Sequence, residues 1–152
     1  MLRIIKKIKY STLKKIEKKV LWLACWMIHN ANHIRENQDG LKVGGHQASS
    51  ASIVSIMTAL YFNILRPEDR VAVKPHASPV FHAIQYLSGL QTKEKIENFR
   101  GFGGAQSYPS RTKDIDDVDI STGSVGLGVA MTSFISLIQD YIARKQFYKN
   151  KP

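Results

Sequence analysis

The chain has 152 residues, a formal net charge of +10 and 43% hydrophobic residues. That length suits one domain with a buried core. It contains no apolar run of about 18 residues, which a transmembrane helix would need. The start lacks the uninterrupted apolar block of a signal peptide, and the single cysteine, Cys25, excludes an internal disulfide. A globular protein of the reducing cytoplasm, with no transmembrane segment, is therefore expected.

The positive charge is concentrated at the two ends of the chain. Residues 1–19 hold eight Lys/Arg against Glu17, and residues 144–152 hold four against none. A nucleic-acid-binding stripe would run across the folded body, so no nucleic-acid partner is expected. We divide the chain into a basic amphipathic extension at 1–11, a domain at 12–148 and a tail at 149–152. The extension could lie on a membrane surface, although a solvated tail is favoured.

Apolar residues that recur every three or four positions predict a packed helix from Thr12 to about Ile34. His29 and His33 lie on one face of it, but the glutamate of a His-Glu-x-x-His zinc site is missing, which disfavours a metal pair. A second helix is predicted from Gln47 to Ile64. Its first turns are made of small residues, and Gly44, Gly45 and His46 precede it.

One convincing strand is predicted over Arg70–Lys74, short and apolar like a buried parallel strand. His76 follows it directly, in the position where ligands gather at the carboxyl ends of strands. The next helix turns Val80 and Leu87 inward, and its His82 is interpreted as a packing or surface histidine.

Residues 98–122 show no regular period and contain four aspartates that lack the spacing of a calcium loop, so a solvated acidic loop is expected. The segment Ser121–Gly128 then enters a last helix through three glycines. Such an entry lets backbone amides approach an anion. The last helix should run from Leu127 to about Phe147 and bury one apolar face, comprising Leu127, Ala130, Phe134, Leu137, Ile138 and Tyr141.

Three blocks in this order resemble the amino-terminal region of thiamine-diphosphate enzymes of the transketolase superfamily. They are Leu41–Ser49, Arg70–Pro79, and Glu97–Arg100 together with Gln106–Pro109 and Gly123–Gly128. The resemblance covers about residues 13–147. It is strongest to the homodimeric first component of the pyruvate dehydrogenase complex and to transketolase-like relatives of it.

The resemblance implies catalytic roles for His46 and His76, which would face the thiazolium and the substrate oxygen. It implies that the cofactor contacts Ser78, Tyr108, Gly123, Ser124, Val125, Gly126 and Leu127. Imidazoles suit this chemistry because they donate and recover a proton near neutral pH. The family's Gly-Asp-Gly motif, which holds Mg²⁺ on the diphosphate, has no counterpart here, so no metal ligand is assigned.

The expected fold is α/β, an incomplete thiamine-diphosphate-binding fold that is mostly helical with one or two strands. The expected function is the amino-terminal cofactor-binding segment of an enzyme of ketol transfer or 2-oxo-acid decarboxylation. Such a segment would be truncated, or completed in a homo-oligomer or by a carboxy-terminal partner chain, and its substrate would be a sugar phosphate or a 2-oxo acid. The alternative is an inactive remnant or interaction module that pairs with such an enzyme. A membrane or nucleic-acid binder, resting on the two termini, is a third possibility.

Overall fold

A computed structural model describes residues 8–36 and 40–147 of the chain, which form helices joined by long loops. Most of the expected extension and the whole tail fall outside these residues. The order along the chain is α1 (Tyr10–His29), the π-helical turn η1 (Asn30–Ile34), α2 (Gln47–Ala51), α3 (Val54–Ala59), the π-helical turn η2 (Leu60–Ile64), the 3₁₀ turn η3 (Pro75–Ala77), α4 (Ser78–Leu87), α5 (Lys93–Glu97) and α6 (Leu127–Arg144). Within the described residues no helix is long and apolar enough to cross a membrane.

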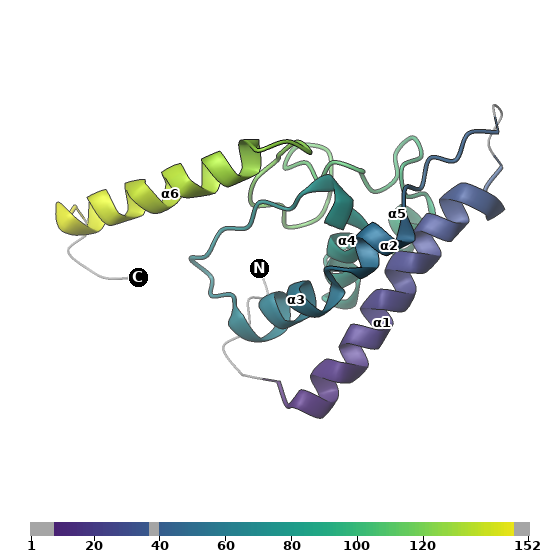
Figure 1. The fold of residues 1–152 in the computed structure, drawn as a ribbon, viewed down its shortest axis with the longest axis horizontal. Coiled ribbons are helices and arrows are strands. Elements are labelled where there is room, and N and C mark those ends of the chain that lie inside the picture. The colour runs from purple at the N-terminus through teal and green to yellow at the C-terminus, as the bar shows by residue number, and fades with distance from the viewer. Residues whose placement is uncertain (1–7, 37–39, 148–152) are drawn as a thin grey trace.

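The core forms where α4 packs against α1, with α2 and α3 beside them (Figure 1). Helix α4 is apolar around most of its circumference and is buried from Ser78 to Gln85, as expected of a central helix. Its Phe81 and Ile84 meet Ala24 and Met27 of α1 in one cluster, all at most 1% exposed. Burying each large side chain contributes about 1.5–3 kcal/mol.

The first two predicted helices are confirmed. Helix α1 and η1 together run without a break over 10–34, against a prediction of 12–34. The helix predicted over 47–64 forms as three pieces, α2, α3 and η2, with an interruption at Ser52–Ile53. It is thus an interrupted element rather than one continuous helix.

The strand predicted at Arg70–Lys74 is wrong. Across the described ranges the only β pairing in this part of the chain is an isolated parallel bridge between Ala72 and Ile120. The apolar composition suited a strand, but a strand needs neighbouring strands to satisfy its backbone groups. The structure is therefore mostly helical, and only this helical part of the expected α/β fold is seen.

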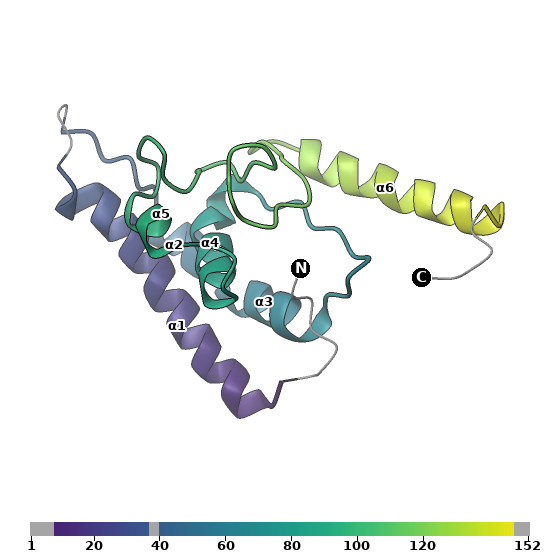
Figure 2. The same cartoon turned by 180° about the vertical axis from the view of Figure 1, so that it is seen from behind.

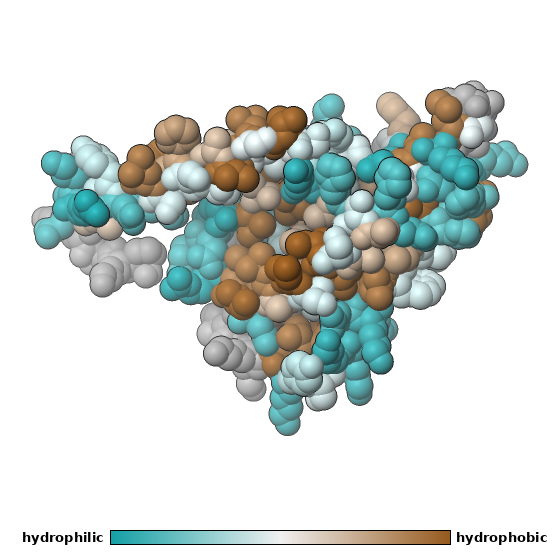
Figure 3. Space-filling model, viewed as in Figure 1, coloured by the Kyte–Doolittle hydropathy of each residue, from teal (hydrophilic) through white to brown (hydrophobic). Residues whose placement is uncertain are grey.

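Helix α6 starts at Leu127, as predicted, but the buried face expected for it is wrong. None of its 18 residues is buried. Figures 1 and 2 show it projecting from the body, and apolar side chains along it are visible in Figure 3. Its exposed large apolar residues are Leu127, Val129, Phe134, Leu137, Ile138 and Tyr141.

The prediction of a solvated acidic loop at 98–122 is also wrong for two of its aspartates, Asp114 and Asp116. Asp116 is 7% exposed and contacts His82, which is completely buried. Asp114 accepts hydrogen bonds from the backbone N–H groups of Gln106 and Ser110. Both carboxylates thus bind other groups of the protein, and His82 is buried in the core rather than at the surface.

Candidate functional site

A cavity of about 320 Å³ opens where α2, η3 and the 98–122 loop meet near the start of α6. Four residues predicted for the site line it: His46, His76, Tyr108 and Ser124. His46 caps α2, His76 lies in η3, Tyr108 belongs to the loop, and Ser124 precedes α6. The fold thus brings four separate segments of sequence to one place, while the roles of these side chains stay predictions.

The backbone before His46 is held by the glycine pair and by Asn32 of η1. The Gly44 N–H donates to Asn32 Oδ1 at 2.6 Å, and Asn32 Nδ2 donates to the Gly45 carbonyl oxygen at 3.1 Å. A Cβ on Gly44 would lie 2.5 Å from the carbonyl oxygen of Ile28, and Gly45 has a φ of +86°. Both glycines are therefore required by helix packing and backbone conformation, whatever ligand the cavity takes.

Arg100 is a lining residue for which the sequence indicated no role. Its Nη1 donates to the Val43 carbonyl oxygen at 2.7 Å, and its guanidinium lies beside Gly45. Burial lowers the pKa of this guanidinium, whereas the nearby Tyr108 raises it. The group stays protonated at neutral pH and places a positive charge at the wall of the cavity. The only signal for it was its place in the Glu97–Arg100 block.

The remaining predicted site residues do not line this cavity. Ser78 is completely buried, and its hydroxyl has no hydrogen-bond partner among the described residues. Val125 and Leu127 are 74% and 53% exposed. Nothing lies within 4 Å of the Cβ positions of Gly123 and Gly126, so these glycines border open space.

His29, His33 and Cys25, all considered in the sequence, do not line this cavity. The rings of His29 and His33 are 5.0 Å apart between centroids. Within the described ranges no three His, Cys, Asp or Glu residues come together as a metal site would require. Cys25 is half-buried on α1, consistent with the packing role predicted for it.

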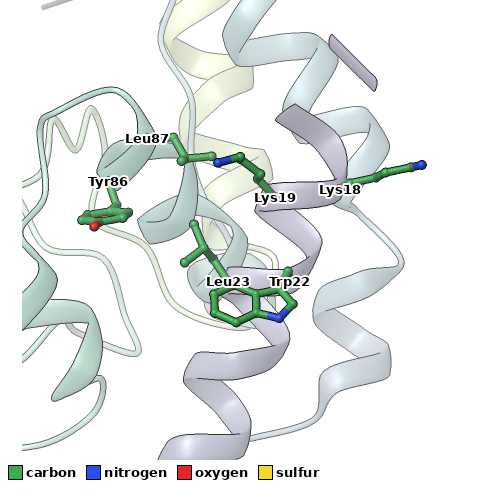
Figure 4. Close-up of a pocket in the computed structure, with 6 residues that line it drawn as sticks. All are labelled: Lys18, Lys19, Trp22, Leu23, Tyr86 and Leu87. Carbon is green, nitrogen blue, oxygen red and sulfur yellow. The ribbon is translucent and has the colours of Figure 1, made fainter. Parts of the chain in front are cut away.

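A second cavity, of about 400 Å³, lies between α1 and α4 (Figure 4). It is lined by Lys18, Lys19, Trp22, Leu23, Tyr86 and Leu87. The lining is apolar except for the two lysines, and it includes no residue that the sequence predicted for function.

Comparison with curated proteins identifies relatives of this chain. It is 31% identical to a pyruvate dehydrogenase E1 component of Mycobacterium tuberculosis over 120 residues, 72% of this chain and 12% of that protein. It is 30% identical to the protein of the same name from Pseudomonas aeruginosa over 143 residues, 88% of this chain and 16% of that protein. A transketolase of Staphylococcus aureus is 29% identical over 86 residues, 56% of this chain and 12% of that protein.

The chain thus spans 12–16% of the length of these three relatives. No family model matches it, and no solved structure matches it. The chain is a relative of one stretch of the pyruvate dehydrogenase E1 components and transketolases, which places it in the transketolase superfamily.

Proposed function

We propose that this chain forms the amino-terminal part of a thiamine-diphosphate site in an enzyme of ketol transfer or 2-oxo-acid decarboxylation. The observation that carries the proposal is the meeting of His46, His76, Tyr108 and Ser124 around one cavity. Each comes from a block that resembles the superfamily, and the relatives bear the names of enzymes of this chemistry.

The residues of the cavity fit one side of such a cofactor. Ile28, Pro75 and Pro79 supply apolar surface for a ring, and three serines and Tyr108 supply hydroxyl groups. Arg100 adds a cation, which suits an anionic ligand or substrate. The described residues include no cluster of carboxylates that could hold Mg²⁺.

Thiamine diphosphate, when bound, would supply a nucleophilic carbon for reaction at the carbonyl of a 2-oxo acid or ketose phosphate. His46 and His76 are both exposed at the cavity, where an imidazole can donate a proton to a substrate oxygen and take it back near neutral pH. Arg100 keeps its positive charge and attracts the phosphate or carboxylate of the substrate. The Asn32 contacts to the glycine pair fix the backbone that presents His46.

We propose further that the site is completed by additional polypeptide, either in the same chain, in a homo-oligomer or in a partner chain. Two observations support this: the cavity is open toward solvent at both histidines, and α6 exposes a row of apolar side chains. Large exposed apolar surfaces usually mark an interaction site.

The test is calorimetric titration of thiamine diphosphate and Mg²⁺ into the purified chain, alone and mixed with a candidate completing segment. We expect binding in the mixture and weak or no binding by the chain alone. His46→Ala or His76→Ala should lower turnover of the completed enzyme at least about tenfold, since general acid–base catalysis typically contributes more than that.

His33→Ala is the matched control, because His33 is an exposed histidine on η1 that does not line the cavity. Turnover should not change in that variant, and circular dichroism should show that all three variants fold. Wild-type turnover in both cavity variants would refute the assigned roles. Absence of cofactor binding in every mixture would favour the alternative, an inactive interaction module.

A further inference from the structure

His82 and Asp116 form a buried polar pair that links α4 to the 98–122 loop. Both side chains are completely shielded from solvent, and His82 Nδ1 contacts Asp116 Oδ2. Phe81 and Phe99 pack edge-on against the imidazole, with ring centroids 5.4 and 5.9 Å away. Buried polar groups are costly unless they are hydrogen-bonded, so a pair in such surroundings is a strong structural constraint.

The hydrogen bond at the other ring nitrogen fixes where His82 carries a proton. Nε2 lies 2.7 Å from the carbonyl oxygen of Gln106, which can only accept. Nε2 must therefore be protonated and donate, and the Asp116 carboxyl holds Nδ1. The carboxyl orients the ring, and the ring in turn holds the backbone of Gln106.

The same peptide segment is held from its other side by Asp114. The Gln106 N–H donates to Asp114 Oδ1 at 3.0 Å, and the Ser110 N–H donates to Asp114 Oδ2 at 2.8 Å. Both backbone groups of Gln106 are thus bound to side chains. The next two residues are Ser107 and Tyr108, which line the cavity, and Pro109 after them is buried.

Residues 98–122 contain no helix, and the bonds of His82 and Asp114 to the Gln106–Ser110 part add to the backbone hydrogen bonds of this loop. We propose that His82, oriented by Asp116, is a positioning residue that holds Ser107 and Tyr108 at the wall of the cavity. It acts through the Gln106 carbonyl and does not touch the cavity itself. The placement of Ser107 and Tyr108 does not depend on the proposed function, whereas the effect on cofactor binding rests on it.

The test uses the full chain labelled with 3-fluorotyrosine and followed by ¹⁹F NMR, with the Tyr108 signal assigned by Tyr108→Phe. His82→Phe preserves the aromatic packing but removes both hydrogen bonds, so the Tyr108 signal should lose its wild-type position. The signal of Tyr141 on α6 should not move. His82→Gln places an amide donor near Gln106 and should restore the Tyr108 signal, a rescue that simple loss of folding would not show.

Asp117→Asn is the matched control, because Asp117 adjoins Asp116 but makes none of the hydrogen bonds that hold His82 and Gln106. It should leave the Tyr108 signal unchanged. Histidine ¹⁵N spectra of the wild type should show a proton on Nε2 of His82. An unchanged Tyr108 signal in a folded His82→Phe chain, or an unprotonated Nε2, would overturn the proposal.

In the completed enzyme, His82→Phe should weaken thiamine-diphosphate binding at least about tenfold, comparable to the loss of an outer hydrogen-bond partner at a metal site. His82→Gln should recover most of that loss. If wild-type protein binds no cofactor while the Tyr108 signal still depends on His82, the proposed function fails and the positioning role stands. If wild type binds cofactor but His82→Phe binds equally well, the positioning role fails.

Discussion

Replacing Gly44 by alanine tests why the glycine pair precedes His46. The new methyl group would lie 2.5 Å from the Ile28 carbonyl oxygen, 2.9 Å from Asn32 Oδ1 and 3.1 Å from the Cβ of Ala31. The first of these is backbone at the end of α1 and cannot turn away as a flexible side chain could. The loop must therefore move off the helix, which would break the 2.6 Å hydrogen bond from the Gly44 N–H to Asn32.

The expected loss is about 2–4 kcal/mol of unfolding free energy. Overpacking contributes about 1–3 kcal/mol and the lost hydrogen bond about 0.5–1.5 kcal/mol. Urea unfolding followed by circular dichroism measures this loss directly. In a thermal melt, each kcal/mol corresponds to a change in Tm of about 2–4 °C for a chain of this size.

Gly123→Ala is the matched control, because Gly123 also belongs to a block expected to face the cofactor. No atom lies within 4 Å of its Cβ position, and its φ is outside the left-handed region. Alanine there should leave stability equal to wild type or raise it by up to about 1 kcal/mol. If Gly44→Ala unfolded at the same urea concentration as Gly123→Ala, the packing account of the glycine pair would be refuted.

Three further substitutions test the site and the core. Asn32→Ala removes two hydrogen bonds to the glycine pair and should lower the unfolding free energy by about 1–3 kcal/mol in urea titrations. A smaller change would mean that the backbone at Gly44 and Gly45 keeps its conformation without these bonds. Phe81→Ala empties a core position that is 1% exposed and should cost about 3–5 kcal/mol, whereas Phe134→Ala, at 65% exposure, should stay within about 0.5 kcal/mol of wild type; equal losses in thermal melts would contradict this placement of the core. Burial raises the pKa of the Asp116 carboxyl in the folded chain, although its hydrogen bond to His82 opposes the shift. The folded state then binds this proton more tightly, so its contribution to stability is present below the unfolded pKa and is lost as the pH rises through the folded pKa. Asp116→Asn should flatten that acid-range slope in urea midpoints, and an unchanged slope would assign it to another group.

Local sequence patterns predicted the helices well. The apolar spacing over 12–34 depends only on neighbours along the chain, and it located α1 and η1 within two residues. The start of α6 at Leu127 followed equally from the glycine entry. The strand could not be predicted in the same way, because strand formation depends on pairing with distant segments. The apolar segment Arg70–Lys74 would need neighbouring strands that the described residues do not supply.

Site residues that belong to local sequence motifs could be predicted, whereas residues whose role depends on long-range contacts could not. His46 and His76 were selected from their glycine and proline contexts and share one cavity in the structure. In the sequence Asp116 could not be distinguished from the other aspartates of its loop, and only the fold brings it to His82, 34 residues away along the chain. Asn32 gave no signal, since its bond to Gly44 depends on the path of the intervening loop.

The stability of helix α6 should depend on the concentration of whatever binds its apolar face. An 18-residue helix without buried residues has little tertiary packing to stabilise it, so its helical and unwound forms are close in free energy. A ligand that binds only the helical form adds RT ln(1 + [L]/Kd) to its stability. Hydrogen exchange in α6 should therefore slow in proportion to the occupancy of its apolar face, while exchange in the buried helix α4 should change little.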